Sequence, residues 1–297
     1  MIARLHSLDV QAFHFHCRCA ACACVRRRVG RSARRRLLAI DSATERLALA
    51  AVDDGRTSSH DPLPARAACR VEALDLDGGA AASAQALPAA LALLERLGWT
   101  FAGLDAIAFG RGPGGFTGLR TACAVAQGLA FGQGLPVVPV DSLAIVAEDA
   151  ARRVVEEHLL GGAAPASVWV LMDARMDEIY AGCYVRDGDA GWRAVVEPAL
   201  TTPALLADLW RATPPAVAAG SALEAFGERL ELAGALRIPR ERSRANALGW
   251  LAAAGFARGD AVAADRALPV YLRDKVAQTT AEREAAKAAR ATAEPTP

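Results

Sequence analysis

The residues with the clearest capacity to bind a ligand lie in a glycine-rich turn. Gly110, Gly112 and Gly115 stand between two apolar runs in a Gly-x-Gly-x-x-Gly pattern, and Asp141 closes the second run. Bare backbone N–H groups at the start of a helix favour an anion. A strand, a glycine turn, a helix and a second strand also make up a parallel βαβ unit. The pattern therefore predicts either a ligand-binding turn or a surface on which another backbone packs closely.

The same spacing matches a dinucleotide-binding turn, with Asp141 where a ribose-binding acid would stand. Three features weaken that interpretation: the pattern alone is a weak signal, Pro113 removes an N–H donor, and the unit comes third in its sheet. A Walker A loop is excluded because no Lys-Ser/Thr pair follows the glycines. A dinucleotide-binding oxidoreductase remains an alternative.

Two carboxylates stand at matching places in two predicted hairpins. Asp41 and Asp173 each end an apolar strand, and a short polar turn and an alternating strand follow. Overlaying the two hairpins also places Glu45 on Asp177. Such carboxylates could hold magnesium or position water, but each could equally accept N–H bonds from its own turn.

Other catalytic groups are scarce after residue 36. There is no Gly-x-Ser-x-Gly elbow, and the two histidines, His60 and His158, lie far apart in the sequence. No His-x-x-x-His or similar ligand set occurs there, so we expect no metal site in this part of the chain. The sequence offers little support for hydrolysis.

Residues 1–36 differ from the rest of the chain. They carry Cys17, Cys19, Cys22 and Cys24 with nine Arg and one Asp. Zinc binding is conceivable, but the cysteines are too closely spaced for an ordinary finger. We interpret residues 1–36 as a disordered extension that could not fold alone. Because the whole chain has a net charge of +1, residues 37–297 carry −7, which argues against a standalone nucleic-acid-binding protein.

The predicted elements fall into two related halves, 37–160 and 166–278, each opened by one of the hairpins. Residues 279–297 lack apolar periodicity and are interpreted as a mobile tail. Two lobes that each open with an Asp-bearing hairpin predict an actin-like ATPase fold, in which the facing turns hold nucleotide phosphates. Further elements are expected as a strand at 70–76, helices capped by Ser83, Thr117 and Ser142, and helices at 204–211, 221–233 and 245–257.

The predicted helix after the glycine turn is rich in small residues, among them Gly118, Ala122 and Ala126. Each glycine destabilises a helix by about 1 kcal/mol relative to alanine. Close approach of another helix would explain why these residues are tolerated. Packing within the chain and a subunit interface are both open, and we favour the interface.

The composition, 53% hydrophobic and 23% charged, is typical of a soluble globular protein. No apolar run approaches the roughly 18 residues that a membrane-spanning helix needs. Cys69, Cys123 and Cys183 occur singly in apolar contexts, so we expect no disulfide framework and a cytoplasmic location.

Four segments of the chain resemble the TsaB (YeaZ) family. They are LLAIDSATERLALA, LDAIAFGRGPGGFTGLRTACAVAQGLAFG, MDARMDEIYAGCY and PVYLRDKVA. The resemblance spans Leu37 to Ala277, and its GRGPGGFTGLR block is highly specific. It implies an α/β, actin-like ATPase (ribonuclease H-like) fold of two related lobes, each a mixed sheet flanked by helices.

The resemblance also implies a function. Members act in making N6-threonylcarbamoyladenosine next to the anticodon of tRNAs that read codons starting with A. The family's protein is the non-catalytic partner of TsaD, works with the ATPase TsaE, self-associates, and meets tRNA only through the complex. TsaD carries a His-x-x-x-His pair where this chain has Ser83 and Leu87. We therefore expect no catalysis, no peptidase activity and no membrane partner.

The resemblance implies no required cofactor, although weak binding of ATP or ADP by a vestigial cleft is expected. A nucleotide-dependent enzyme of the actin-like superfamily remains an alternative. The cleft candidates are Asp41, Ser42, Thr44, Gly112, Gly114, Gly115 and Asp173.

The resemblance further implies that the helices 83–97 and 117–131 bind TsaD or a second copy of the chain. We expect Ala126→Arg to block co-purification with TsaD while leaving the fold intact. The interface candidates are Leu87, Leu91, Leu94, Gly118, Ala122, Ala126 and Leu129.

Overall fold

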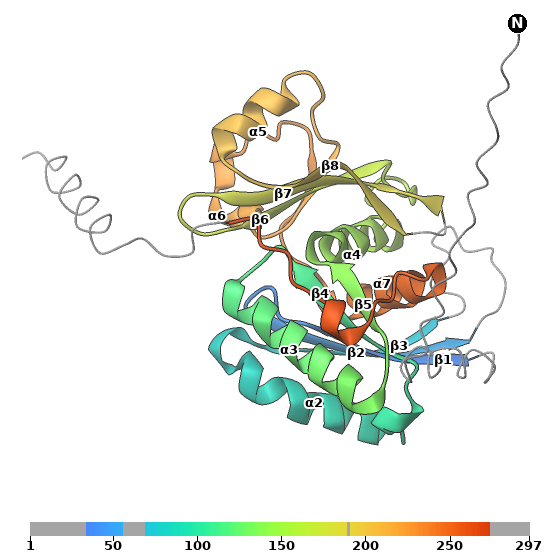
Figure 1. Ribbon diagram of the computed structural model, residues 1–297. Helices are drawn as coiled ribbons and strands as arrows, with labels where there is room; N and C mark the ends of the chain where they lie inside the picture. Colours follow the sequence, from blue (N-terminus) through green and yellow to red (C-terminus); the bar gives the residue numbers. More distant parts are fainter. Residues whose placement is uncertain (1–33, 56–68, 189–190, 274–297) are drawn as a thin grey trace, which may run out of the picture. The chain divides into compact units, whose positions relative to one another are not determined.

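The computed structural model describes residues 34–55, 69–188 and 191–273, which hold two five-stranded mixed sheets (Figure 1). In the first sheet, β1 pairs antiparallel with β2 and β2 with β3, while β4 and β5 run parallel to β1. The strand order is β3-β2-β1-β4-β5. The bounds are β1 Arg34–Asp41, β2 Arg46–Gly55, β3 Cys69–Asp77, β4 Ala106–Gly112 and β5 Val137–Asp141.

The second sheet repeats this arrangement, with the order β10-β9-β6-β7-β8. Across the second sheet from β8 to β10, the strands occupy the same positions and run in the same relative directions as the strands from β3 to β5 in the first sheet. The predicted pair of related lobes is therefore confirmed. The bounds are β6 Ser167–Asp173, β7 Ile179–Arg186, β8 Trp192–Thr201, β9 Val217–Ala219 and β10 Leu236–Ile238.

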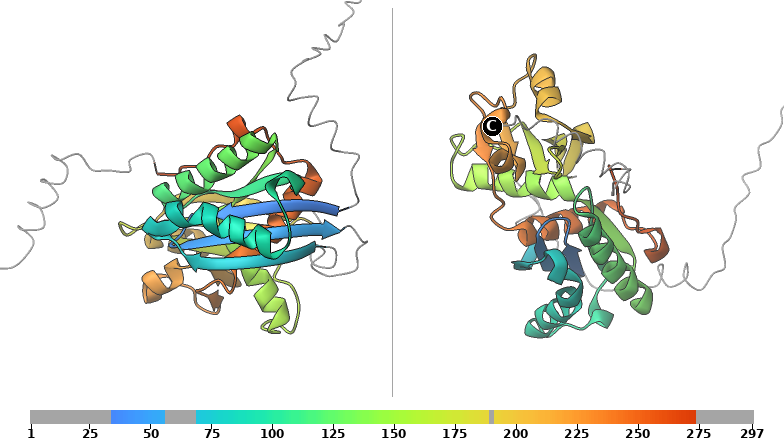
Figure 2. Two further views of the ribbon diagram at one scale, coloured as in Figure 1. Left: turned by 90° about the horizontal axis from the view of Figure 1, so that it is seen from below. Right: turned by 90° about the vertical axis from the view of Figure 1, so that its left-hand side faces the viewer.

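Helices cover both faces of each sheet (Figures 1 and 2). The helices α2, Ala82–Arg96, and α3, Phe116–Gln133, lie on the outer face of the first sheet. Between the sheets lie α4, Ser142–Glu156, and α7, Arg244–Arg258. The outer face of the second sheet is covered by α5, Pro203–Trp210, and α6, Ala222–Ala225.

This layering explains the unbroken apolar run at the end of β1. Leu37 and Ala39 face the core between the sheets, whereas Leu38 and Ile40 face α2 and α3. All four side chains are fully buried. A strand that is covered on both faces needs apolar residues at successive positions, not at alternate ones.

The helix α7 belongs to the second half of the sequence but packs on the first sheet, against β1, β2, β3 and β5. The approach is close at Gly249, where an added Cβ would lie 2.7 Å from the Val71 side chain and 3.1 Å from Ala50. The end of the chain thus completes the core of the first sheet.

Several predicted boundaries differ from the structure. The strand β1 begins at Arg34, so residues 34–36 are part of the sheet and not of the extension. The rest of the extension and the tail 279–297 lie outside the described residues. The predicted helix 221–233 is replaced by the short α6 and a turn of 3-10 helix, Gly227–Arg229, because Gly227 adopts a φ of 55° and ends α6.

The predicted caps were wrong at three helices. The residue before α2 is Ala81, which makes no side-chain cap, and the N-cap of α3 is Gly115. The helix α4 is capped by Asp141, whose Oδ1 accepts N–H bonds from Leu143 at 2.8 Å and Ala144 at 3.3 Å. The carboxylate that closes β5 thus also begins the next helix, which leaves the Ser142 hydroxyl for another contact.

In the part of the chain that the structure describes, no helix has the length and apolar character needed to cross a membrane.

Candidate functional site

A cavity of about 1100 Å³ lies between the β1–β2 turn and the β6–β7 turn. The glycine turn that follows β4 and the segment 270–273 complete its walls. The structure therefore brings together five of the seven cleft candidates, and the other two, Asp41 and Gly112, lie next to the wall. The five in the wall are Ser42, Thr44, Gly114, Gly115 and Asp173.

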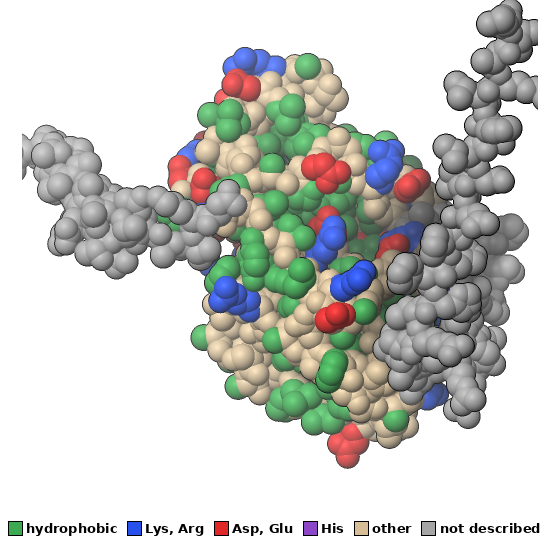
Figure 3. Space-filling model, viewed as in Figure 1, with side chains coloured by type: hydrophobic (Ala, Val, Ile, Leu, Met, Phe, Trp, Pro, Cys, Tyr) green, Lys and Arg blue, Asp and Glu red, His purple; other side chains and the backbone are tan. Residues whose placement is uncertain are grey.

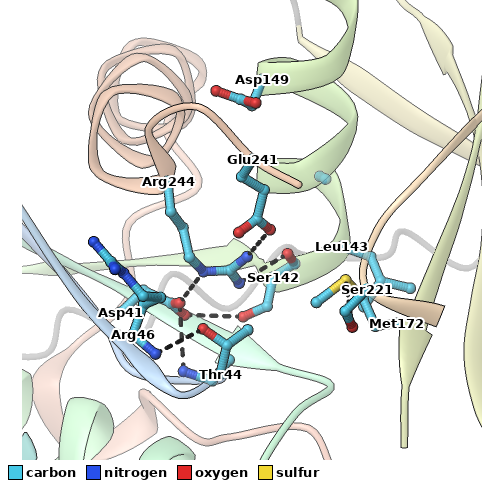
Figure 4. Close-up of polar contacts among 12 residues, drawn as sticks. Asp41, Thr44, Arg46, Ser142, Leu143, Asp149, Met172, Ser221, Glu241 and Arg244 are labelled. Carbon is cyan, nitrogen blue, oxygen red and sulfur yellow. Dashed lines mark hydrogen bonds and ion pairs between the residues drawn. The ribbon is translucent and has the colours of Figure 1, made fainter. Parts of the chain in front are cut away.

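Asp41 is fully buried and has two side-chain partners (Figure 4). Its Oδ1 accepts a hydrogen bond of 3.1 Å from the Ser142 hydroxyl, and its Oδ2 accepts one of 2.5 Å from Arg244 Nε. Arg244 is 2% exposed and also donates to Glu241 Oε1 at 2.6 Å and to the Ser142 carbonyl at 3.1 Å. The guanidinium therefore lies between two carboxylates.

The charges around Arg244 keep it cationic. Burial by itself would lower the pKa of Arg244, but the charges of Asp41 and Glu241 outweigh burial and raise it above the ordinary value. Burial is also the main reason that the pKa of Glu241 is raised, although the positive charge of Arg244 acts in the opposite direction. The network is thus a largely buried ionic group in the wall of the cavity.

The start of α7, which carries Arg244, is fixed by two more carboxylates. Asp75 Oδ2 accepts from the Ser243 hydroxyl at 2.7 Å, and its Oδ1 accepts from the Ala245 N–H at 3.1 Å. Asp149 on α4 accepts from the N–H groups of Arg242 at 2.9 Å and Ser243 at 3.0 Å. Burial raises the pKa of Asp149, and these two hydrogen bonds partly offset that rise. Arg244 is therefore held in place by the first sheet and by α4.

Two backbone donors of the glycine turn form hydrogen bonds within the protein. The N–H of Gly115 donates to the Ala43 carbonyl at 2.7 Å. The N–H of Gly112 donates to the Ser142 hydroxyl oxygen at 3.0 Å, so this hydroxyl joins the glycine turn to Asp41.

The glycines allow the β1–β2 turn to press against the start of α3. An added Cβ would lie 1.7 Å from the Ser42 carbonyl oxygen at Gly118 and 2.4 Å from the Ala43 carbonyl oxygen at Gly114. The Ser42 hydroxyl donates to the Gly118 carbonyl at 2.8 Å. Of the two possibilities that the glycine pattern left open, close backbone packing is the one these contacts favour.

Asp173 is engaged by its own turn. Its Oδ1 accepts from the Arg175 N–H at 2.8 Å, and its Oδ2 accepts from Arg175 Nη1 at 3.4 Å. Arg175 Nη2 also donates to Glu45 Oε1 at 3.1 Å, which links the β6–β7 turn to the β1–β2 turn. Thr44 Oγ1 accepts from the Arg46 N–H at 3.1 Å.

The interface candidates separate into exposed and buried residues. Leu87 and Leu91 on α2 are 43% and 49% exposed. Leu94, Ala122 and Ala126 are buried against the first sheet and cannot reach a partner. Leu129 and Gly118 are partly buried, and Gly118 is in contact with Ser42. The expected tolerance of Ala126→Arg was wrong, because a fully buried alanine leaves no room for a guanidinium.

Sequence reasoning missed Phe131, whose side chain is 83% exposed near the end of α3. Gly128 and Gly132 are exposed on the same side of α3, and Ala122, Ala126 and Ala130 are buried on the other. An aromatic residue between two glycines, off the alanine stripe, was the available signal. We call Leu87, Leu91 and Phe131 the outer apolar face; Figure 3 shows hydrophobic side chains on the part of the surface where α2 and α3 lie.

Arg244, Glu241 and Ser142 were also missed as parts of the site. The segment PRERSRAN contains several charged residues, and nothing in their spacing marks Arg244 as the buried one. Among the described residues, no group of three or more His, Cys, Asp or Glu side chains is placed to hold a metal ion.

Two mixed sheets of matching order with facing hairpin turns define an α/β protein of the actin-like, ribonuclease H-like fold class. Within that class, the chain belongs to the TsaB (YeaZ) family, which acts in tRNA threonylcarbamoyladenosine biosynthesis. It is 31% identical to the tRNA threonylcarbamoyladenosine biosynthesis protein TsaB of Escherichia coli (strain K12), over 82% of this chain and 96% of that protein. The family predicted from the four sequence segments is thereby confirmed.

Other comparisons agree with this family. Identity to the Haemophilus influenzae TsaB is 32%, over 56% of this chain and 64% of that protein. The structure of YeaZ from Pseudomonas aeruginosa superimposes with a TM-score of 0.65 and 33% identity, covering 80% of this chain and 100% of that one. A second Pseudomonas aeruginosa structure, described as similar to peptidase YeaZ, superimposes with a TM-score of 0.65 and 34% identity, with the same coverage of both chains. A family model for TsaD, tRNA N6-adenosine threonylcarbamoyltransferase, matches residues 80–225.

Proposed function

We propose that the chain is a non-catalytic subunit that supports N6-threonylcarbamoyladenosine formation by binding a TsaD-type transferase. The modified adenosine would be the one next to the anticodon in tRNAs that read codons starting with A. TsaE would join the same cytoplasmic assembly, and tRNA would be contacted through the transferase.

The observation that carries this proposal is the outer apolar face. Leu87, Leu91 and Phe131 are 43%, 49% and 83% exposed on two adjacent helices. Large apolar side chains left exposed on adjacent helices are candidates for protein association. The glycines that flank Phe131 would let a partner helix approach α3 closely. A second copy of this chain could use the same face when the transferase is absent.

A non-catalytic role is supported by the state of the two cleft carboxylates. Asp41 is paired with Arg244, and Asp173 with Arg175. A catalytic carboxylate needs access to a substrate, a water molecule or a metal ion. Asp41 is fully buried and ion-paired with Arg244, so we propose that neither transfer chemistry nor peptide hydrolysis takes place at this cleft.

Phe131→Arg tests the docking proposal. An anchor at the centre of an interface is worth 2 kcal/mol or more, so we expect at least about a 30-fold loss of affinity for the TsaD-type partner. The thermal unfolding temperature should stay close to that of the wild type, because the Phe131 side chain makes no core contact. Affinity would be measured by calorimetry with the purified partner.

Leu209→Arg is the matched control. Leu209 is 51% exposed and also lies in the last turn of its helix, α5, on the second sheet. This variant should bind the partner as the wild type does. Wild-type affinity of a folded Phe131→Arg protein would contradict the proposed face, and unchanged threonylcarbamoyladenosine in tRNA after depletion of the chain would contradict the functional role.

A further inference from the structure

The actin-like fold implies a magnesium-bound nucleotide between the two hairpin turns, and the residues present here can be tested for that fit. Magnesium takes carboxylate oxygens as ligands, and a phosphate takes backbone N–H donors at a helix start. The strand-end carboxylate of the first hairpin is Asp41, and the helix start is the glycine turn before α3.

The carboxylate of Asp41 does not fit a metal ligand. It is fully buried, one oxygen accepts from Ser142, and the other forms an ion pair of 2.5 Å with Arg244. Arg244 comes from the start of α7, lines the cavity and also contacts Glu241 (Figure 4). A cationic side chain therefore lies where a metal ion bound to Asp41 would have to lie.

On the phosphate side of the cleft, two N–H donors of the glycine turn are already engaged. The N–H groups of Gly112 and Gly115 are used by Ser142 and Ala43. The Ser42 hydroxyl donates to the Gly118 carbonyl, and at Gly114 and Gly118 the β1–β2 turn is so close that a Cβ would clash with it. The turn that would receive phosphate oxygens is packed against the β1–β2 turn instead.

We infer that the guanidinium of Arg244 is the built-in cation of this cleft and replaces a metal-bound nucleotide as the link between the first sheet, α4 and α7. The cation contacts Asp41 on β1, the Ser142 carbonyl at the start of α4, and Glu241 just before α7. The protein therefore needs no ligand to hold these three elements together. This role is independent of the proposed docking face.

The consequence can be tested by removing the cation. Without the guanidinium, Asp41 and Glu241 would present two uncompensated carboxylates to one space, and hard divalent cations prefer such oxygens. We expect Arg244→Ala to unfold at a lower temperature than the wild type and to regain part of the loss when Mn²⁺ or Mg²⁺ is added. The wild type should show no such response, with Mn²⁺ affinity at this site at least tenfold weaker.

Two further variants separate the cation role from general damage. In Arg242→Ala the lost partner is Glu156, the last residue of α4, and both Asp41 and Glu241 keep Arg244, so this variant should not respond to Mn²⁺. Arg244→Ala combined with Asp41→Asn should lose the Mn²⁺ response, because one carboxylate is gone. Binding would be followed by electron paramagnetic resonance of Mn²⁺ and stability by thermal unfolding of the full chain.

A wild-type protein that is stabilised by magnesium-ADP would overturn the inference, as would an Arg244→Ala protein that is as stable as the wild type or that ignores divalent cations. If Arg244→Ala does not fold, two other measurements still test the inference. They are calorimetry of magnesium-ADP binding to the wild type and electron paramagnetic resonance of Mn²⁺ with Arg244→Lys. In contrast to the weak ATP or ADP binding expected from the sequence, the wild type should bind no magnesium-ADP. The lysine variant, which keeps the charge, should fold without a metal response. None of these outcomes depends on the binding of a TsaD-type partner.

Discussion

Asp41 and Arg244 lie 203 residues apart in the sequence, and Arg244 Nε donates a hydrogen bond of 2.5 Å to Asp41 Oδ2. Glu148 on α4 has a similar role, because it is 1% exposed and accepts from Trp192 Nε1 at 2.7 Å and Arg186 Nη1 at 2.6 Å. It also pairs with Arg152. Removing one partner of a buried ion pair costs about 3–5 kcal/mol. At the scale of single residues, buried charges in this protein connect elements that are distant in the sequence.

Cys69 gives a prediction for pH dependence. Burial, with a smaller contribution from Asp54, raises the pKa of its thiol from 9.0 to about 12. Between those values the unfolded chain has lost the thiol proton and the folded chain keeps it, so the free energy of unfolding falls as pH rises. At about 1.4 kcal/mol per pKa unit, the loss from this residue is at most about 4 kcal/mol.

Urea unfolding of the wild type and Cys69→Ala at a series of pH values from about 8 to about 11.5 would measure this effect. The wild type should lose more stability than the variant across the range, because only the wild type carries the thiol. Parallel loss in the two proteins would show that Cys69 makes no such contribution.

At the scale of elements, different parts of α3 make different kinds of contact. Its alanine stripe is buried against the first sheet, its start is pressed against the β1–β2 turn, and Phe131 faces outward. The glycines of α3 are therefore present for different structural reasons. Gly118 is required by the Ser42 carbonyl at 1.7 Å from an added Cβ, whereas nothing lies within 4 Å of a Cβ at Gly128.

Gly118→Ala and Gly128→Ala are expected to change stability in opposite directions. The first forces the β1–β2 turn away from α3 and should cost about 1–3 kcal/mol or more, as overpacking does. The second removes a helix-interior glycine at an exposed site and should add about 0.5–1 kcal/mol. Denaturant unfolding of both variants measures the two effects. A stabilised Gly118→Ala protein would contradict the close packing described for this turn.

At the scale of the whole described body, segments late in the sequence pack against the first sheet. The helix α7 covers the inner face of the first sheet, and Val262 forms a β-bridge with Val137. Further on, the Val270 N–H donates to the Arg111 carbonyl at 2.6 Å, and Arg273 donates to the Ala174 carbonyl at 3.0 Å. The two sheets therefore share one core between them, and we expect the protein to unfold in a single transition.

Residues 34–160 expressed alone should not form the native fold. The fragment contains the whole first sheet but lacks α7, so the apolar inner face of β1 and β2 would lie open to water. The same fragment joined through a flexible linker to residues 241–273 should recover cooperative thermal unfolding, followed by circular dichroism. A sharp, cooperative transition of the shorter fragment would contradict this dependence.

The sequence by itself determined the local units and their family. Apolar runs that end in Asp41 and Asp173 predicted the two hairpins, and the glycine pattern predicted the β4–α3–β5 unit, because strand period, helix period and turn residues act over a few positions. The duplication followed from the repeated hairpin pattern. Specific motifs supplied the family, because they are recognisable without knowledge of three-dimensional contacts.

Only the tertiary structure decided which of these residues face one another. In α2, packing on the first sheet buried Leu93 and Leu94 while leaving Leu87 and Leu91 exposed. Helical spacing shows which residues share a side but not which side is covered. The place of Arg244 beside Asp41 depends on α7 returning to the first sheet, a contact across most of the chain that no local pattern encodes.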